Sequence, residues 1–124
     1  MKPMVFERKA LPDQRIDLSA LVPARLAGLA AGGIEALPIN TTRNPLSIGD
    51  IFHVKAGDPS SIRITGATSR FDNVGAELDG GEVHVVGDVG ELAGRLMKGG
   101  KLSVSGNAGP WAGSGLRGGR IEIG

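Results

Sequence analysis

The sequence GGEVHVVGDVG at residues 80–90 returns as GGKLSVSGNAG at residues 99–109 and as GGRIEIG at residues 118–124. The step between these segments is 19 residues, and it aligns apolar residues in columns. The columns are Val83/Leu102/Ile121, Val85/Val104/Ile123 and Leu78/Met97/Leu116. A fixed period of about 20 residues is typical of chains that stack one structural unit on the next.

Within each unit apolar and polar residues alternate, as in Val83-His84-Val85, which indicates a strand with one buried face. Ile62 and Ile64 form an earlier equivalent pair. We therefore expect an all-β fold, a right-handed parallel β-helix built as a single-stranded solenoid with coils of about 19–21 residues. Glycines of the repeat are expected at its corners, because glycine accepts the backbone angles of tight turns. These structural glycines are Gly80, Gly81, Gly87, Gly99, Gly100, Gly106, Gly118 and Gly119.

Residues 1–47 lack the repeat and are expected to form a lead-in to it. We expect strands at 4–8 and 37–40, and one short amphipathic helix within 16–31 whose start is restricted by Pro23. Residues 48–124 are expected to form the coils. The last coil would be open after Gly124, so we expect either a longer protein, with the chain truncated at its C-terminus, or another protein that covers this end.

The composition favours an aliphatic core, because aromatic residues make up only 3% of the 124 residues. The net charge of +1 gives no reason to expect a nucleic-acid partner. The absence of cysteine excludes disulfides and thiolate metal sites in this chain and fits a reducing compartment. No apolar run is long enough for a signal peptide or a membrane span, so we expect a cytoplasmic protein with no membrane partner.

The sequence predicts no catalytic, cofactor-binding or metal-binding residue in this chain. The segment GSGLRG at residues 113–118 has the spacing of a dinucleotide-binding loop, but a strand-like unit follows it where a helix is required. His53 and His84 are the only histidines, and both are expected on outward-facing positions of strands. Trp111 is expected to pack at a corner or to contact a partner.

Two cationic pairs follow the same step and are candidate contacts with a partner or an anion. They are Lys98 with Arg117, and Lys101 with Arg120. Stacked units would bring like charges together with a modest repulsion, so the stripe would favour an acidic surface or an anionic ligand. The alternative is a solvated turn without a partner.

The segments at 80–90 and 97–109 resemble the glycine-motif β-helix family. That family includes the C subunit of formylmethanofuran dehydrogenase and the C-terminal domain of the glutamate synthase large subunit. The segments QRIDLS at 14–19, LAGL at 26–29 and SIGDIF at 47–52 are similar to the lead-in of the former. They are most similar to the bacterial version found in the formyltransferase/hydrolase complex.

The resemblance implies a cytoplasmic multisubunit complex of one-carbon metabolism, in which this chain is a non-catalytic scaffold. Expected partners are amidohydrolase-like, formyltransferase-like and dehydrogenase-like subunits. The complex would use methanofuran or a related carrier, and archaeal-type homologues would add a molybdenum- or tungsten-pterin. Whether the complex performs redox chemistry or formyl transfer and hydrolysis is left open.

Two alternatives remain beside this interpretation. The first is a glutamate-synthase-like domain that braces a flavin and iron–sulfur amidotransferase. The second is a binding module that uses Lys98 and Arg117 to hold an acidic polymer.

Overall fold

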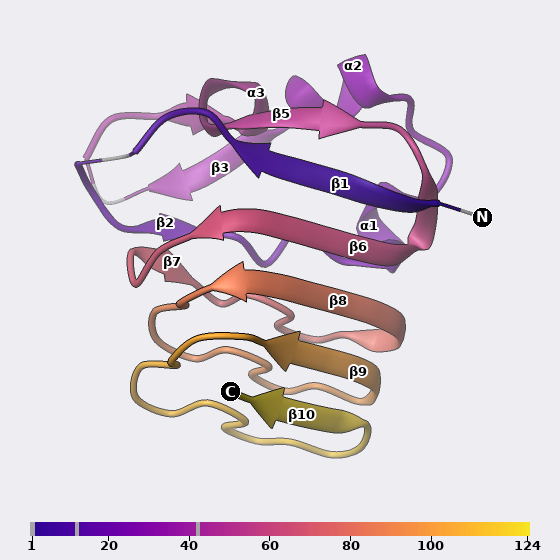
Figure 1. Ribbon diagram of the computed structural model, residues 1–124, viewed down its shortest axis with the longest axis vertical. Helices are drawn as coiled ribbons and strands as arrows, with labels where there is room; N and C mark the ends of the chain where they lie inside the picture. Colours follow the sequence, from indigo (N-terminus) through magenta and orange to yellow (C-terminus); the bar gives the residue numbers. More distant parts are fainter. Residues whose placement is uncertain (1, 12, 42) are drawn as a thin grey trace.

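The computed structural model describes residues 2–11, 13–41 and 43–124, and their strands form two sheets (Figure 1). The six-stranded sheet has the order β10-β9-β8-β6-β1-β5. Its strands are β1 (Pro3–Arg8), β5 (Phe52–Lys55), β6 (Asp58–Ala67), β8 (Asp79–Gly87), β9 (Gly99–Val104) and β10 (Arg120–Ile123). The four-stranded sheet has the order β4-β3-β2-β7. Its strands are β2 (Ile16–Asp17), β3 (Pro38–Thr41), β4 (Leu46–Ser47) and β7 (Phe71–Asp72), and short helices are α1 (Pro23–Leu26), α2 (Ala31–Glu35) and α3 (Ile48–Ile51).

Strands β6, β8, β9 and β10 run parallel. Pairing of β8, β9 and β10 follows the 19-residue step, while β6 pairs with β8 at a step of 21 residues, as in Ile62 with Val83. Val83 pairs with Leu102, and Leu102 pairs with Ile121. Val83 and Leu102 are fully buried, while Ile121 in the outermost strand is half-buried. The expected superposition of this column is therefore confirmed.

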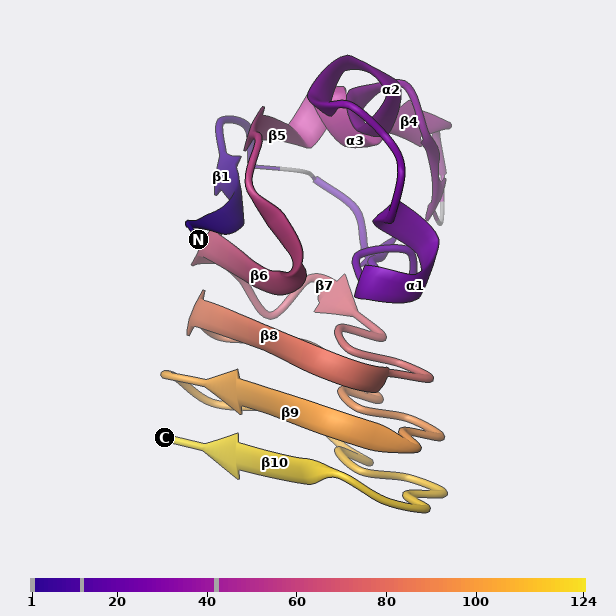
Figure 2. The same cartoon turned by 90° about the vertical axis from the view of Figure 1, so that its right-hand side faces the viewer.

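The prediction of an all-β parallel β-helix is nevertheless wrong, because the fold is a pair of mixed sheets with three short helices. Three strand pairs are antiparallel: β1 with β5, β2 with β3, and β3 with β4. The first strand, β1, is inserted between β5 and β6 instead of leading into a stack. Figure 2 shows that β8, β9 and β10 lie one beneath another, with return segments beside them that carry no strand. A constant period indicates that successive units stack in register. Parallel strands at one end of a mixed sheet also stack in register, so the period alone does not require a β-helix.

The short helix expected within 16–31 is present as α1, which begins at Pro23, but it is shorter than expected. Ile16 and Asp17 form the strand β2 instead, and Ala31 begins a second helix, α2, where the expected helix would end. Pro23 occupies the first turn of α1, where its missing N–H costs nothing. Ala27 leaves the helical conformation with ψ of 133°, and Gly28 follows in the left-handed region with φ of 83°, so the chain turns before α2 begins. The strands expected at 4–8 and 37–40 are confirmed as β1 and β3.

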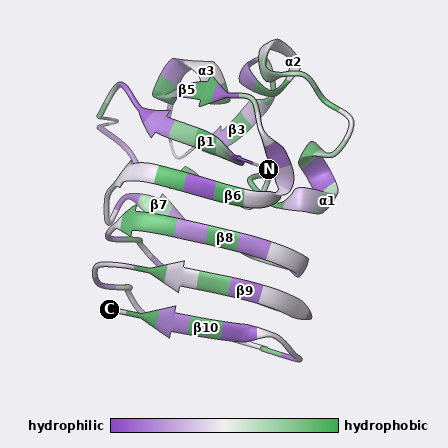
Figure 3. Ribbon diagram, turned by 45° about the vertical axis from the view of Figure 1, so that its right-hand side comes forward, coloured by the Kyte–Doolittle hydropathy of each residue, from purple (hydrophilic) through white to green (hydrophobic). Residues whose placement is uncertain are grey.

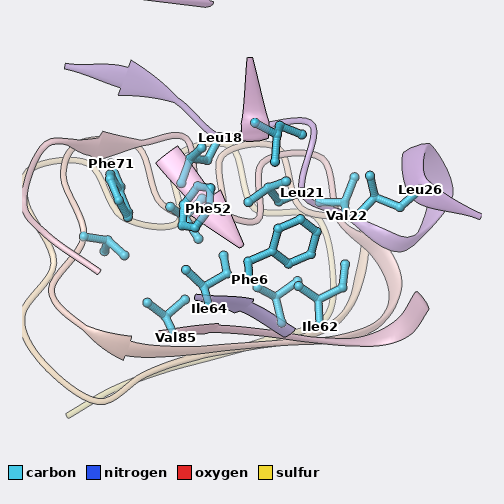
Figure 4. Packing of buried hydrophobic residues seen from close by; sticks show 14 of the residues in the cluster. Phe6, Leu18, Leu21, Val22, Leu26, Phe52, Ile62, Ile64, Phe71 and Val85 are labelled. Atoms are coloured by element: carbon cyan, nitrogen blue, oxygen red, sulfur yellow. The ribbon is translucent and has the colours of Figure 1, made fainter. Parts of the chain in front are cut away.

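The core between the sheets is mainly aliphatic, as expected, but it also contains all three phenylalanines of the chain. Phe52 packs edge-on against Phe6 with ring centres 6.0 Å apart, and lies 5.5 Å from Phe71. Figure 4 shows Phe6 and Phe52 near Ile62 and Ile64, and Phe71 on the far side of Phe52. The low aromatic content of the sequence did not indicate this cluster, because three aromatic side chains are enough to fill one end of a small core.

The return segments of the repeat copy one unusual backbone conformation at the same step. Asn73, Leu92 and Trp111 have φ of 57°, 61° and 62°, in the left-handed region that side chains rarely adopt. Backbone hydrogen bonds join successive segments, as in Asn73 N–H to Glu91 O at 3.0 Å and Leu92 N–H to Pro110 O at 3.0 Å. The segments therefore stack by backbone geometry where no strand ladder exists.

Among the expected corner glycines, the adjacent pair at 99–100 shows two different requirements. Gly100 has φ of 76°, and a Cβ there would lie 2.6 Å from Gly81 O. A Cβ on Gly99 would have its nearest contacts at 3.5 Å, which is an ordinary separation. The glycine motif is thus required by geometry at the second position of this pair and tolerated at the first.

One apolar cluster joins the two regions of the chain, since it includes Leu18, Ile48 and Leu102. The division into residues 1–47 and 48–124 stays a prediction. In the part of the chain that the structure describes, no helix is long and apolar enough to cross a membrane.

Candidate functional site: the outward face of the six-stranded sheet

The six-stranded sheet buries one face and presents the other, because side chains alternate along each strand. Figure 3 shows this alternation as hydrophobic and hydrophilic bands along β6, β8 and β10. Residues paired across the strands align in two polar rows, which together we call the outward face. The rows are Ser61/Glu82/Lys101/Arg120 and Arg63/His84/Ser103/Glu122.

A chain of hydrogen bonds links Glu82, His84 and Ser103 on this face. His84 Nε2 lies 2.9 Å from Glu82 Oε2, and His84 Nδ1 lies 2.7 Å from Ser103 Oγ. The hydrogen bond from His84, together with its charge, lowers the pKa of Glu82 from its ordinary value. Since the carboxylate accepts, Nε2 carries a proton in that contact, while the direction of the contact between Nδ1 and the serine hydroxyl depends on whether Nδ1 also carries one.

A carboxylate, an imidazole and a serine hydroxyl in this order can activate the serine as a nucleophile. Whether Ser103 can act in this way depends on the groups around it. Acyl transfer also needs N–H donors aimed at the developing oxyanion. Ser103 lies within β9, whose backbone groups pair with β8 and β10 in the plane of the sheet. We therefore interpret the chain of bonds as a relay that fixes the orientation of the imidazole on an exposed face.

The sequence analysis placed both histidines outward but did not connect His84 to Ser103. The available signal was the 19-residue step between them, together with the two-residue spacing from Glu82 to His84. His53 is exposed on β5, where it pairs with Glu7 of β1. It lies apart from the relay.

Of the four predicted cationic contacts, the structure brings Lys101 and Arg120 together as partners in β9 and β10. The expected repulsion is offset by Glu122, whose Oε1 lies 2.9 Å from Arg120 Nε and 3.6 Å from Lys101 Nζ. Such exposed pairs contribute little stability, but they neutralise the row locally.

Lys98 and Arg117 lie on successive return segments and not on the outward face. Lys98 N–H donates to Leu78 O at 2.8 Å, and Arg117 N–H donates to Met97 O at 2.9 Å, so both residues occupy equivalent positions. Their side chains are exposed. Their role as contacts with a partner or an anion stays a prediction.

A hollow of about 430 Å³ opens on the outward face over the second polar row. Arg63, His84 and Ser103 line it, and so do the exposed apolar residues Val86 and Ile123. The Arg63 side chain is exposed and forms no ion pair with any residue in the described ranges. Glu122 also lines the hollow, so its lining holds charged residues of both signs beside the apolar side chains.

The structure also places the remaining features that were singled out in the sequence. The segment at 113–118 forms turns and leads into the strand β10, so the helix required by a dinucleotide site does not follow it. Trp111 is 65% exposed, which leaves contact with a partner as the prediction for this residue. Among the residues described, no cluster of three or more His, Cys, Asp or Glu side chains is arranged to hold a metal ion.

Comparison with known proteins identifies the class first. No protein-family model matches the chain. Its fold matches a chain in the crystal structure of the formyltransferase/hydrolase complex FhcABCD from Methylorubrum extorquens in complex with methylofuran. The match has a TM-score of 0.91 and 39% sequence identity, and it covers 96% of this chain and 45% of that one. The fold is thus that of a component of a formyl-handling complex.

The sequence identifies the particular component. The chain is 42% identical over 84 residues to the C subunit of the formyltransferase/hydrolase complex Fhc of Methylorubrum extorquens, across 68% of this chain. The resemblance stated from the sequence is therefore confirmed, and the chain belongs with the C subunits of this complex. It spans 31% of the length of that curated relative.

Proposed function

We propose that this chain is a non-catalytic scaffold subunit of a formyltransferase/hydrolase complex in one-carbon metabolism. The observation that carries the proposal is the match to a chain of the FhcABCD complex over 96% of this chain at 39% identity. That complex was crystallised with methylofuran, so we propose a methylofuran-like formyl carrier for the complex that contains this chain. The match favours formyl transfer and hydrolysis over pterin-dependent redox chemistry.

A rigid platform supports the scaffold role on physical grounds. Four strands of the outward face pair in one parallel register, and backbone hydrogen bonds also join the return segments behind them. A preordered surface loses little conformational entropy when a partner docks, so more of the contact energy appears as affinity. The partners in this proposal are the other cytoplasmic subunits, of amidohydrolase, formyltransferase and dehydrogenase-like type.

The test compares the complex with and without this chain. The genes for all its subunits are co-expressed, with or without the gene for this one, and the products are examined by size-exclusion chromatography and by formyl-transfer rate. We expect the remaining subunits to elute as smaller species when the chain is absent. An intact complex with the full rate in its absence would contradict the scaffold role.

The exposed pair Lys98 and Arg117 provides a narrower test of the same proposal. If these residues contact an acidic surface, the double variant Lys98→Ala/Arg117→Ala will release from the complex at lower salt than the wild type, because surface charge pairs are screened. Equal retention at about 50 mM and about 300 mM salt would remove the pair from the interface.

A further inference from the structure

Asp79 is set apart from the other aspartates of the chain by the residue that follows it. Of the seven aspartates it alone precedes a glycine, Gly80. An aspartyl side chain cyclises to a succinimide when the next backbone nitrogen attacks its carboxyl carbon, and a side chain on the next residue hinders this attack. Because glycine has no Cβ, the Asp79–Gly80 bond is the least hindered of the seven.

The structure leaves the Asp79 carboxylate free to make that approach. Its side chain is exposed and takes part in no hydrogen bond or ion pair with the residues at 2–11, 13–41 and 43–124. Each of the other six aspartates accepts a hydrogen bond or forms an ion pair. They are Asp13, Asp17, Asp50, Asp58, Asp72 and Asp88.

The backbone at Gly80 also lies outside regular strand pairing. The pairing of β8 with β9 shifts between Asp79 and Glu82, and its pairing with β6 begins at Glu82 with Ser61. A Cβ built on Gly80 would meet no atom within 4 Å, and a hollow of about 220 Å³ opens beside the bond. The irregular start of β8 therefore leaves room for ring closure and access for water.

From this arrangement we propose that Asp79–Gly80 is a modification site at which isoaspartate forms spontaneously. The Gly80 nitrogen forms a bond to the Asp79 carboxyl carbon, and the hydroxyl of the carboxyl group leaves as water with the proton of that nitrogen. A second water opens the succinimide at the former main-chain carbonyl, so the main chain now runs through the side-chain carbon. The composition of the product is unchanged, and the inference is independent of the proposed function.

The rearrangement adds a methylene group to the main chain between two closely packed segments. Leu78 is buried, and its carbonyl accepts hydrogen bonds from the N–H groups of Lys98 and Gly99. On the other side, a Cβ on Gly81 would lie 2.5 Å from Ser60 O, so the backbone there packs tightly against β6. The modified chain should therefore melt at a lower temperature than the fresh one.

The first experiment ages the full chain in neutral buffer at physiological temperature and maps isoaspartate by mass spectrometry of its peptides. A methyltransferase that moves a methyl group from S-adenosylmethionine to isoaspartyl carboxylates provides a second readout. Asp88 is the matched control in the same chain, because it is also exposed but precedes Val89 and accepts a hydrogen bond from Asn107 N–H at 2.8 Å. We expect several-fold more isoaspartate at Asp79 than at Asp88, and equal amounts would overturn the proposal.

Two substitutions test the chemistry of the site. Asp79→Glu should abolish the signal, because its cyclisation would require a six-membered ring. Asp79→Asn should raise it, because a neutral amide is attacked more readily than a carboxylate. Thermal melting of the fresh variants verifies that these exposed substitutions leave the fold intact. Isoaspartate at this position that does not differ among the three proteins would contradict the succinimide route.

A synthetic peptide of residues 74–86 tests what the fold contributes. A bond that the fold protected would react only through local opening, so the folded chain would be far slower than the peptide. We expect the two rates to agree within about tenfold, since the bond lies outside regular pairing. Isoaspartate in the peptide with none in the folded chain would overturn the inference, whether or not the chain is a scaffold. Unchanged melting of the modified chain would overturn the effect on β8 alone.

Discussion

The two ends of the six-stranded sheet are built by different means. Around β1 and β5, segments distant in sequence are brought together by a buried cluster of Phe6, Phe52 and Phe71. Around β8, β9 and β10, neighbouring strands come from successive units, and the same column positions hold aliphatic residues. The comparison shows that the period of the repeat sets the pairing of its strands, while the packing of the region outside the repeat depends on a few large side chains.

The largest expected effect tests the aromatic end. Phe52→Ala should lower the free energy of unfolding by about 3–5 kcal/mol, because it removes a fully buried ring that contacts both other phenylalanines. Chemical denaturation followed by circular dichroism measures the change. Trp111→Ala is the control, since its side chain is 65% exposed and should change stability by less than about 0.5 kcal/mol. Equal effects of the two substitutions would remove the distinction between the regions.

The next effect tests the backbone of the repeat. Gly100→Ala should cost roughly 2–4 kcal/mol, from a left-handed conformation and from overlap with Gly81 O. Gly99→Ala should be nearly neutral, because its Cβ would have ordinary contacts. Thermal and urea denaturation of the two variants provides the comparison. Similar losses at both positions would show that the glycine pair matters as a unit and not through one backbone angle.

A smaller effect tests the junction between the regions. Asp72 Oδ2 accepts a hydrogen bond from Arg15 Nε at 2.8 Å, and Asp72 Oδ1 accepts one from Glu91 N–H at 2.8 Å. Asp72→Ala should lower the free energy of unfolding by about 1–3 kcal/mol, since a backbone N–H loses its partner.

The matched control for this junction is an exposed ion pair. Asp13 pairs with Arg43, and their side chains are 81% and 58% exposed, so Asp13→Ala should have an effect within about 0.5 kcal/mol of zero. Denaturant unfolding of both variants measures the difference. A larger loss for Asp13→Ala than for Asp72→Ala would contradict the junction.

The smallest effect is a pH dependence at the start of α3. Hydrogen bonds from the Ser47 N–H and hydroxyl hold the pKa of Asp50 below its ordinary value. A lowered pKa contributes stability above the ordinary carboxyl range, and this contribution is lost as the pH falls through the folded value. The difference in urea midpoint between wild type and Asp50→Asn should therefore be present at about pH 7 and shrink toward about pH 3. A difference that grows on acidification would contradict the capping contact.

The sequence predicted local features well where the signal was repeated. The register of Val83, Leu102 and Ile121 follows from the period, because equivalent positions in stacked units must pair. The outward placement of His84 follows from alternation along its strand. The helix expected within 16–31 is present from Pro23 but ends at Leu26, because Ala27 and Gly28 leave the helical backbone conformation, which apolar spacing does not indicate.

The candidate site depended on contacts that no local pattern encodes. Glu122 pairs with both Lys101 and Arg120, so one of the two positive charges in this part of the predicted stripe is compensated within the chain. Arg63 was not singled out in the sequence, because one arginine in a strand has no distinguishing spacing.

By itself the sequence determined the 19-residue register of the repeat, the alternation of its strands and the relationship to a known family, because each is written as a recurring pattern along the chain. Only the tertiary structure decided that β1 enters between β5 and β6, so that mixed sheets replace the expected β-helix. The same holds for the aromatic cluster and for the hollow beside Arg63. The physical reason is that pairing and burial join residues far apart in the chain, and each such pairing occurs once, without a repeat to announce it.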